Sequence, residues 1–354
     1  MKGGGRLRRL APVTGLLLLA PWVGEFLLGS SPIQHVAAAL VLLVPLYGGG
    51  ALLVREVARR FGRGYPAIVL LGAAYGVIEA GLIDQSMFNP AFLDGGSDAG
   101  FVTRANQALG YVAGHAVWSI TVPIAMVELM VRDRSDKPWL GRKGMAAAAI
   151  LYLLGCAIVF SFIYAEYQFV AEPAQLAGAA AAAVLLTVLA FAVGRGGAAK
   201  PTAGGAEAGG GAPGALPAGR GVSPWRAGLG AFLASSAFVA RPEHSWIGLF
   251  AGALLLAAAW FAVRRWSRSA RWNVRHRLAL VSGALFTYAW LGFFVTHLLW
   301  PENRIAWFGN ALFATAAIAL VAVMARRVRE AERRGDEARL PEDCGKPSDC
   351  GSRA

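Results

Sequence analysis

The chain has 354 residues, of which 56% are hydrophobic and 16% are charged, and its formal net charge is +13. Soluble globular proteins average about 45–50% apolar and about 25% charged residues, so this composition excludes an ordinary soluble domain. The apolar residues lie in runs of about 20, which as helices are long enough to cross a hydrocarbon core of ~30 Å. Because these runs do not alternate with polar residues, we expect helices rather than a β-barrel.

Ten apolar runs follow one another along the chain, so we predict an all-α, polytopic transmembrane helix bundle of about ten spans. The first run begins behind four basic residues, as a signal peptide does. It continues without a clean cleavage site, and we therefore expect a retained first helix. The predicted spans are 12–30, 34–54, 66–84, 112–131, 145–165, 175–194, 227–241, 245–263, 278–299 and 305–326.

Basic residues in alternate gaps between these runs predict the topology. By direct count, 31 of the 34 Lys and Arg residues fall on one side, and only Arg104, Arg241 and Arg304 fall on the other. The positive-inside rule then places both ends in the cytoplasm, N-in and C-in, with an even number of spans. The short seventh run is needed, because without it the arginines between 264 and 277 would lie outside.

The same charges bear on partners and location. Since they flank apolar runs, we expect them to contact anionic headgroups of the lipid bilayer on the cytoplasmic side, and we expect no nucleic acid. The bias toward Ala, Gly and Arg is typical of a GC-rich bacterial genome. The predicted location is therefore the bacterial cytoplasmic (plasma) membrane, as a multi-pass protein. The sequence indicates no particular cofactor or oligomeric state.

A stretch rich in Gly, Ala and Pro divides the chain at 195–223. It cannot bury a core, so we predict a flexible cytoplasmic linker. The linker separates a six-helix membrane region, 1–194, from a four-helix membrane region, 224–326. A cytoplasmic tail, 327–354, continues the last helix and then frays. Cys344 and Cys350 of the tail are too few for a four-ligand zinc site, and no metal site is expected.

Charged side chains inside a span are costly and usually face the bundle interior. Glu25, Glu79 and His115 are the clearest cases, and the predicted topology places all three in the outer half of the membrane. Glu79 follows Gly76 on a small-residue face that admits a neighbouring helix, so we expect it to point into the protein. Two interpretations stay open: a buried Glu that fixes helix packing, or a group that binds a proton or cation or takes part in catalysis.

Three further residues also have two interpretations. His115, at the start of its predicted span, either caps the helix at the interface or pairs with Glu79 across adjacent helices. Glu25 either lines the same site or reaches the headgroups. His297 lies near the end of its span beside Trp300 and Pro301, where an interfacial anchor is expected.

Two segments break the regular pattern. Pro45 and the glycines 48–50 interrupt the second span, which predicts either a kink or a broken helix that lines a cavity, as transport proteins use. The outer loop 85–111 carries apolar residues such as Met87 and Phe92. It either covers the bundle as a lid or packs at the interface.

The stretch Tyr75-Gly-Val-Ile-Glu79 and the later Tyr111-x-x-x-His115 resemble motifs of the CAAX-protease-like family of intramembrane proteins. The resemblance implies a hydrolase in which Glu79 activates water, His115 assists, and a later histidine comes from His297. Ala80 stands where that family has a second Glu. The segment 114–129 also resembles uncharacterised polytopic prokaryotic membrane proteins, a likeness that implies no activity.

The leading hypothesis is small-solute or ion- or proton-coupled transport through an outer-half polar site, with Glu25, Glu79 and His115 as binding residues. One alternative is an intramembrane hydrolase of the CAAX-protease-like type, with Glu79, His115 and His297 as catalytic residues. Another is a structural or assembly protein of the membrane. The balance favours a protein that is not an enzyme.

Overall fold

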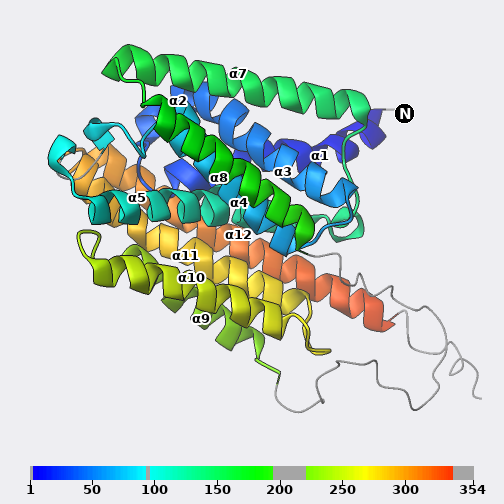
Figure 1. The fold of residues 1–354 in the computed structure, drawn as a ribbon. Coiled ribbons are helices and arrows are strands. Elements are labelled where there is room, and N and C mark those ends of the chain that lie inside the picture. Colours follow the sequence, from blue (N-terminus) through cyan, green and yellow to red (C-terminus); the bar gives the residue numbers. More distant parts are fainter. Residues whose placement is uncertain (1–2, 93–95, 194–220, 338–354) are drawn as a thin grey trace, which may run out of the picture.

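The computed structural model describes residues 3–92, 96–193 and 221–337 (Figure 1). Within these ranges the chain is helical and contains no strand, which confirms the all-α prediction. Most of the predicted linker lies outside the described residues. So does the end of the predicted tail, with Cys344 and Cys350.

The first half of the chain forms four helical rods that contain π-helical turns. The first is α1 (Gly3–Pro21) with a π turn at Trp22–Phe26. The second joins a 3₁₀ turn (Ile33–His35), α2 (Val36–Leu43), a π turn (Val44–Gly48) and α3 (Gly49–Arg60). The third is α4 (Tyr65–Ile78) with a π turn at Glu79–Ile83. The fourth joins α5 (Phe101–Gly114), a π turn (His115–Thr121) and α6 (Val122–Met130).

The remaining helices are regular. They are α7 (Arg142–Tyr167), α8 (Pro173–Ala192), α9 (Pro224–Val239), α10 (Trp246–Trp266), α11 (Val274–Leu299) and α12 (Arg304–Glu337). As predicted, the last helix extends well beyond its apolar span. Short 3₁₀ turns at Pro90–Phe92, Gly96–Asp98 and Arg132–Arg134 lie in the connections.

Eight of the described helices are long and apolar enough to cross a membrane, and Leu10–Phe26 is a shorter apolar helix. The chain is therefore a multi-pass membrane protein. The predicted seventh span forms α9, which has 16 residues and is about 24 Å long, less than a ~30 Å hydrocarbon core. The count of ten spans and the orientation in the membrane stay predictions.

Two boundaries predicted from hydropathy were wrong. The predicted outer loop 85–111 ends early, because α5 already begins at Phe101, and His115 therefore lies in the middle of a long helix rather than at its start. The predicted second span ended at residue 54, but the helix continues to Arg60. Around Pro45 the helix is not unwound; it forms one π turn, so the broken-helix alternative was also wrong.

The fourth rod is the centre of the bundle. In Phe101–Met130, 72% of the apolar stretch is buried, compared with 17% in α7, 17% in α8 and 11% in α10, which lie at the periphery. Figure 1 shows the helices running side by side, with α7 along one edge and α9 and α10 along the opposite edge. The start of α1 and the end of α12 lie at the same end of the bundle.

The helices before and after residues 194–220 share a core. A cluster of buried apolar side chains joins Val23 and Met126 to Leu285 and Met324. At its centre the Trp118 ring stacks on Tyr288 with ring centroids 4.2 Å apart, and the Trp118 indole donates to the Ala284 carbonyl at 2.7 Å. The two predicted membrane regions therefore pack as one bundle.

Glycine permits a close backbone contact between α9 and α11. A Cβ added at Gly283 would overlap the carbonyl oxygen of Gly228, and one at Gly228 would lie 2.9 Å from the Ala279 oxygen. A Cβ added at Gly178 in α8, by contrast, would meet nothing within 4 Å. Small residues at helix contacts allow such backbone approach in membranes.

We expect Gly283→Ala and Gly178→Ala to have opposite effects. Ala is the better helix former by about 0.8–1 kcal/mol, so Gly178→Ala leaves the stability unchanged or raises it. Gly283→Ala forces α9 away from α11 and lowers the free energy of unfolding by about 1–3 kcal/mol. Unfolding by SDS in mixed micelles measures both, and equal effects of the two substitutions would contradict the packing.

Candidate functional site

Each of the four π turns carries a buried or partly buried polar residue. They are Glu25, Tyr47, Glu79 and His115, on four different rods. Well under 1% of residues in globular proteins are π-helical, and such turns are frequently found at functional sites. Four π turns that meet around one polar cluster indicate a functional site far more strongly than any one of these residues alone.

Prolines and a glycine in the sequence favour these turns. Pro21 precedes the first, Pro45 lies within the second, and Pro123 follows the fourth. Because proline has no N–H group and its ring clashes with the carbonyl four residues earlier, it disrupts the regular α-helical ladder. The third turn contains Gly81, which allows helix α8 to approach so closely that an added Cβ would lie 3.0 Å from Ala179.

The central contact joins α4 to the fourth rod. His115 Nε2 lies 2.7 Å from Glu79 Oε2, which is within ion-pair distance. The other ring nitrogen, Nδ1, lies 3.1 Å from the Ser119 hydroxyl one turn along. The Glu79 and His115 side chains are 5% and 12% exposed. This pair is one of the two arrangements predicted for His115. The other prediction, a histidine that caps the helix at the membrane interface, was wrong.

A second carboxylate lies beside this pair. The Tyr47 hydroxyl donates to Glu25 Oε1 at 2.5 Å, and the Ser30 hydroxyl donates to Glu25 Oε2 at 2.5 Å. The Tyr47 ring lies 5.7 Å from the His115 ring, so Tyr47 contacts both Glu25 and the partner of Glu79.

Tyr75 completes the cluster. Its ring lies 5.8 Å from His115 and 6.2 Å from Tyr47, and its buried hydroxyl has no hydrogen-bond partner among the described residues. We refer to Glu25, Tyr47, Tyr75, Glu79 and His115 as the π-turn cluster.

Small residues bring these side chains together, as predicted for the small-residue face of α4 that contains Gly76. A Cβ added at Gly76 would lie 2.9 Å from His115 Cβ, and one at Gly72 would lie 3.1 Å from the Ala116 backbone. A Cβ added at Gly24 would lie 2.9 Å from both the Ser119 hydroxyl and the Tyr47 ring. The cluster is therefore packed tightly between helix backbones.

The structure brings Glu25, Glu79 and His115 together but leaves His297 outside. The His297 side chain is exposed, and its ring lies 6.2 Å from that of Trp307. This position fits the predicted anchor and not a third member of the buried pair. Among the residues described, no group of three or more His, Cys, Asp or Glu side chains is placed to hold a metal ion.

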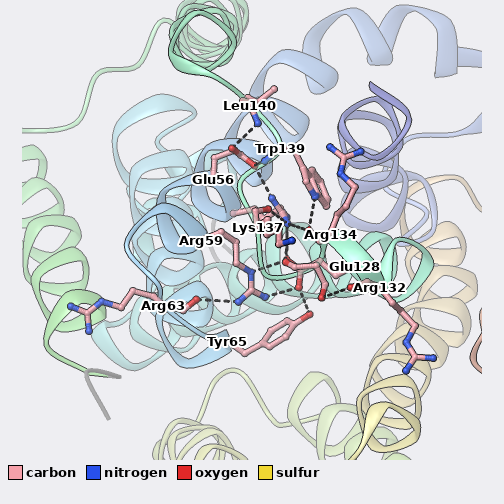
Figure 2. A network of polar contacts seen from close by, with 12 residues as sticks. Glu56, Arg59, Arg63, Tyr65, Glu128, Arg132, Arg134, Lys137, Trp139 and Leu140 are labelled. Carbon is pink, nitrogen blue, oxygen red and sulfur yellow. Dashed lines mark hydrogen bonds and ion pairs between the residues drawn. The ribbon is translucent and has the colours of Figure 1, made fainter. Parts of the chain in front are cut away.

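A second polar site, which the sequence analysis missed, lies near the start of α4 and the end of α6 (Figure 2). At its centre is Glu128, whose side chain is 1% exposed. Oε1 accepts from Arg55 Nε at 3.1 Å and Arg59 Nε at 2.9 Å, and Oε2 accepts from Arg59 Nη2 at 2.6 Å and the Tyr65 hydroxyl at 2.8 Å. One carboxylate thus ties α3 and α4 to α6.

Arg55 extends this network to the connection between α6 and α7. Its guanidinium donates to Glu56 at 2.7 Å and to the carbonyls of Ser135 and Lys137 at 2.9 and 3.0 Å, and it lies 3.3 Å from the ring centre of Trp139. Glu56 accepts from the backbone N–H groups of Trp139 and Leu140. We refer to Arg55, Glu56, Arg59, Tyr65 and Glu128 as the arginine network.

Arg55 and Arg59 belong to the basic residues that flank the apolar runs, which the sequence predicts to contact anionic lipid headgroups. The structure shows instead that they are buried and paired with carboxylates of the protein. The signal for this was Glu56 and Glu128, two acidic residues at span ends otherwise rich in Arg. Buried charges require such partners, so the acidic residues, not the cations, mark the network.

The same three rods contribute to both sites. Thirteen residues of the central rod separate His115 from Glu128, which is about 20 Å along a helix, and fourteen residues of α4 separate Tyr65 from Glu79. Both sites fall within residues 16–332, which match the model of an uncharacterized membrane protein family. The chain belongs to this family. No curated protein and no solved structure matches the chain, and the resemblance to CAAX-protease-like proteins has no support from these comparisons.

We expect Arg55→Met to lower the free energy of unfolding by about 3–5 kcal/mol, because it leaves buried carboxylate and carbonyl groups without their donor. Arg55→Lys restores the charge but not the planar fork that reaches all these acceptors, so it recovers only part of the loss. Arg142→Met, at an exposed arginine, is the matched control. Unfolding in mixed micelles measures all three, and a loss in the control equal to that of Arg55→Met would contradict the network.

Proposed function

We propose that this family member is a proton-coupled membrane transport protein and that the π-turn cluster is its proton-binding site. The observation that carries the proposal is the contact of Glu79 with His115, beside the Glu25–Tyr47 pair, at four π turns inside a bundle of apolar helices. Ionisable residues inside membrane helices commonly form proton relays or substrate sites.

The charge balance of the cluster supports this role. It contains two carboxylates and one imidazole, and among the described residues no Lys or Arg pairs with Glu25 or Glu79. With His115 protonated and both carboxylates ionised, the cluster carries a net negative charge, which is costly in a buried site. One further proton makes it neutral. The cluster therefore has two states that differ by one exchangeable proton.

The helix geometry supports movement around the same site. A π turn holds one residue more than the α-helical ladder needs, and small shifts of helices are a common basis for switching between conformations. The arginine network holds the same rods together about 20 Å away. In the transport cycle that we propose, the π-turn cluster gains and loses its proton while the rods shift relative to each other.

The Glu79–His115 pair also suits a general acid–base role, which favours hydrolysis as the second candidate. His297, the third catalytic residue that the resemblance to CAAX-protease-like proteins implies, does not join the pair. If the protein is a hydrolase, we expect the purified protein to cleave a peptide substrate, and we expect His115→Ala to abolish cleavage without unfolding the protein.

Proton binding is tested by pH-jump currents from vesicles adsorbed on a solid-supported membrane. We expect the wild type to give a transient charge displacement, because protons enter the cluster within the membrane. Glu79→Gln and Glu25→Gln remove an exchangeable proton site while keeping the side-chain shape, so the displacement is reduced or lost.

Glu166→Gln, at an exposed residue near the end of α7, is the control and should match the wild type. Thermal unfolding of each variant shows whether it is folded. A folded Glu79→Gln protein with the wild-type current, or a wild type with none, would rule out the proposal.

A further inference from the structure

A groove of about 340 Å³ lies between the fourth rod and helices α9, α10 and α11, away from both polar sites. Its walls are apolar and consist largely of small residues. The lining residues include Gly230, Ala234, Ala259, Ala262, Trp266 and Ala284.

Two features of the packing leave this space open. The Gly228–Gly283 contact draws α9 onto α11, while α10 stands at the edge of the bundle with 11% of its apolar stretch buried. The alanine side chains and the glycine behind α10 are too small to fill the gap. Since protein interiors pack to the density of organic crystals and apolar cavities do not hold water, such a groove in a bilayer takes up hydrocarbon.

The length of the groove matches one leaflet. Along α10 it extends from Leu255 to Trp266, eleven residues or about 16 Å, roughly half of a ~30 Å hydrocarbon core. Trp266 is the last residue of α10, so the groove ends at the connection to α11. An acyl chain that enters here comes from the leaflet on that side of the membrane.

Exposed arginines lie close in the sequence to this end of the groove. Arg265, Arg268 and Arg271 lie within five residues of Trp266 in the sequence, and none forms an ion pair with a carboxylate among the described residues. The nearby Arg275, by contrast, is held by Glu332 at 2.7 Å. Free guanidinium groups at the end of an apolar groove suit the phosphate of a lipid, because Arg binds phosphate through two parallel hydrogen bonds.

We propose that the groove is a binding site for an anionic phospholipid, with an acyl chain between α9 and α10 and the headgroup at Arg265, Arg268 and Arg271. This inference is independent of proton binding. It depends only on the groove and the charges at its end, and its test does not involve the π-turn cluster.

The test is native mass spectrometry of the protein released from nanodiscs that contain equal amounts of phosphatidylglycerol and phosphatidylcholine. The wild type should retain one phosphatidylglycerol in preference. Ala259→Trp fills the groove and should reduce retention about tenfold, because displacing two buried methylenes already has that effect. Arg265→Gln with Arg268→Gln should keep a bound lipid but lose the preference for the anionic headgroup.

Matched controls separate these effects from general disturbance. Leu254→Trp adds the same ring to an exposed position of α10, and Arg326→Gln with Arg327→Gln removes the same charge from α12. Both controls should bind lipid as the wild type does. Equal retention in Ala259→Trp and Leu254→Trp, or wild-type retention of both lipids in equal amounts, would overturn the proposal.

Discussion

The buried carboxylate of Glu128 fixes the geometry on which the bundle depends. An unpaired carboxylate could not be buried there, and neither could Arg55 or Arg59, so none of the three can be placed without the others. Because the partners lie on α3, α4 and α6, their pairing sets the height of each rod relative to the next. The same rods carry Tyr47, Glu79 and His115 about 12–21 Å farther along. The arginine network therefore also sets which residues meet in the π-turn cluster.

The π turns explain how a polar cluster fits among helices whose sequences are almost entirely apolar. A regular helix offers little room for several polar side chains at one depth, and each π turn displaces the local backbone from the α-helical path. Glycines at the facing positions then allow the rods to close around the cluster, as the Gly76–His115 contact shows. The prolines that disturb the helices and the glycines that admit the neighbours are spread over all four rods. The site is thus a property of the whole assembly rather than of one motif.

The membrane class, the helical content and the approach of Glu79 to His115 could be predicted, because a charge inside an apolar run needs an interior partner and the small residues of α4 indicate the face. The start of α5 could not be predicted, because the polar residues Asn106 and Gln107 interrupt the apolar run and are typical of a loop. In the structure Asn106 is buried and donates to the carbonyls of Val102 and Ser245. The arginine network could not be predicted for a related reason. A charged residue near the end of a span is expected to reach water or headgroups at little energetic cost, and only the fold shows that it is buried.

The two polar sites differ in one chemical respect that assigns them different parts in any conformational cycle. An arginine stays charged across the physiological pH range, so the arginine network can break and re-form but cannot change its charge by exchanging a proton there. The π-turn cluster has carboxylate and imidazole groups, whose charge changes with each proton bound. In the cycle that we propose, a proton bound by the π-turn cluster alters the attraction between the third and fourth rods, and these two rods also meet in the arginine network through Tyr65 and Glu128. The proton binding that we propose would therefore act on the same helices that the permanent charges of the arginine network hold in register.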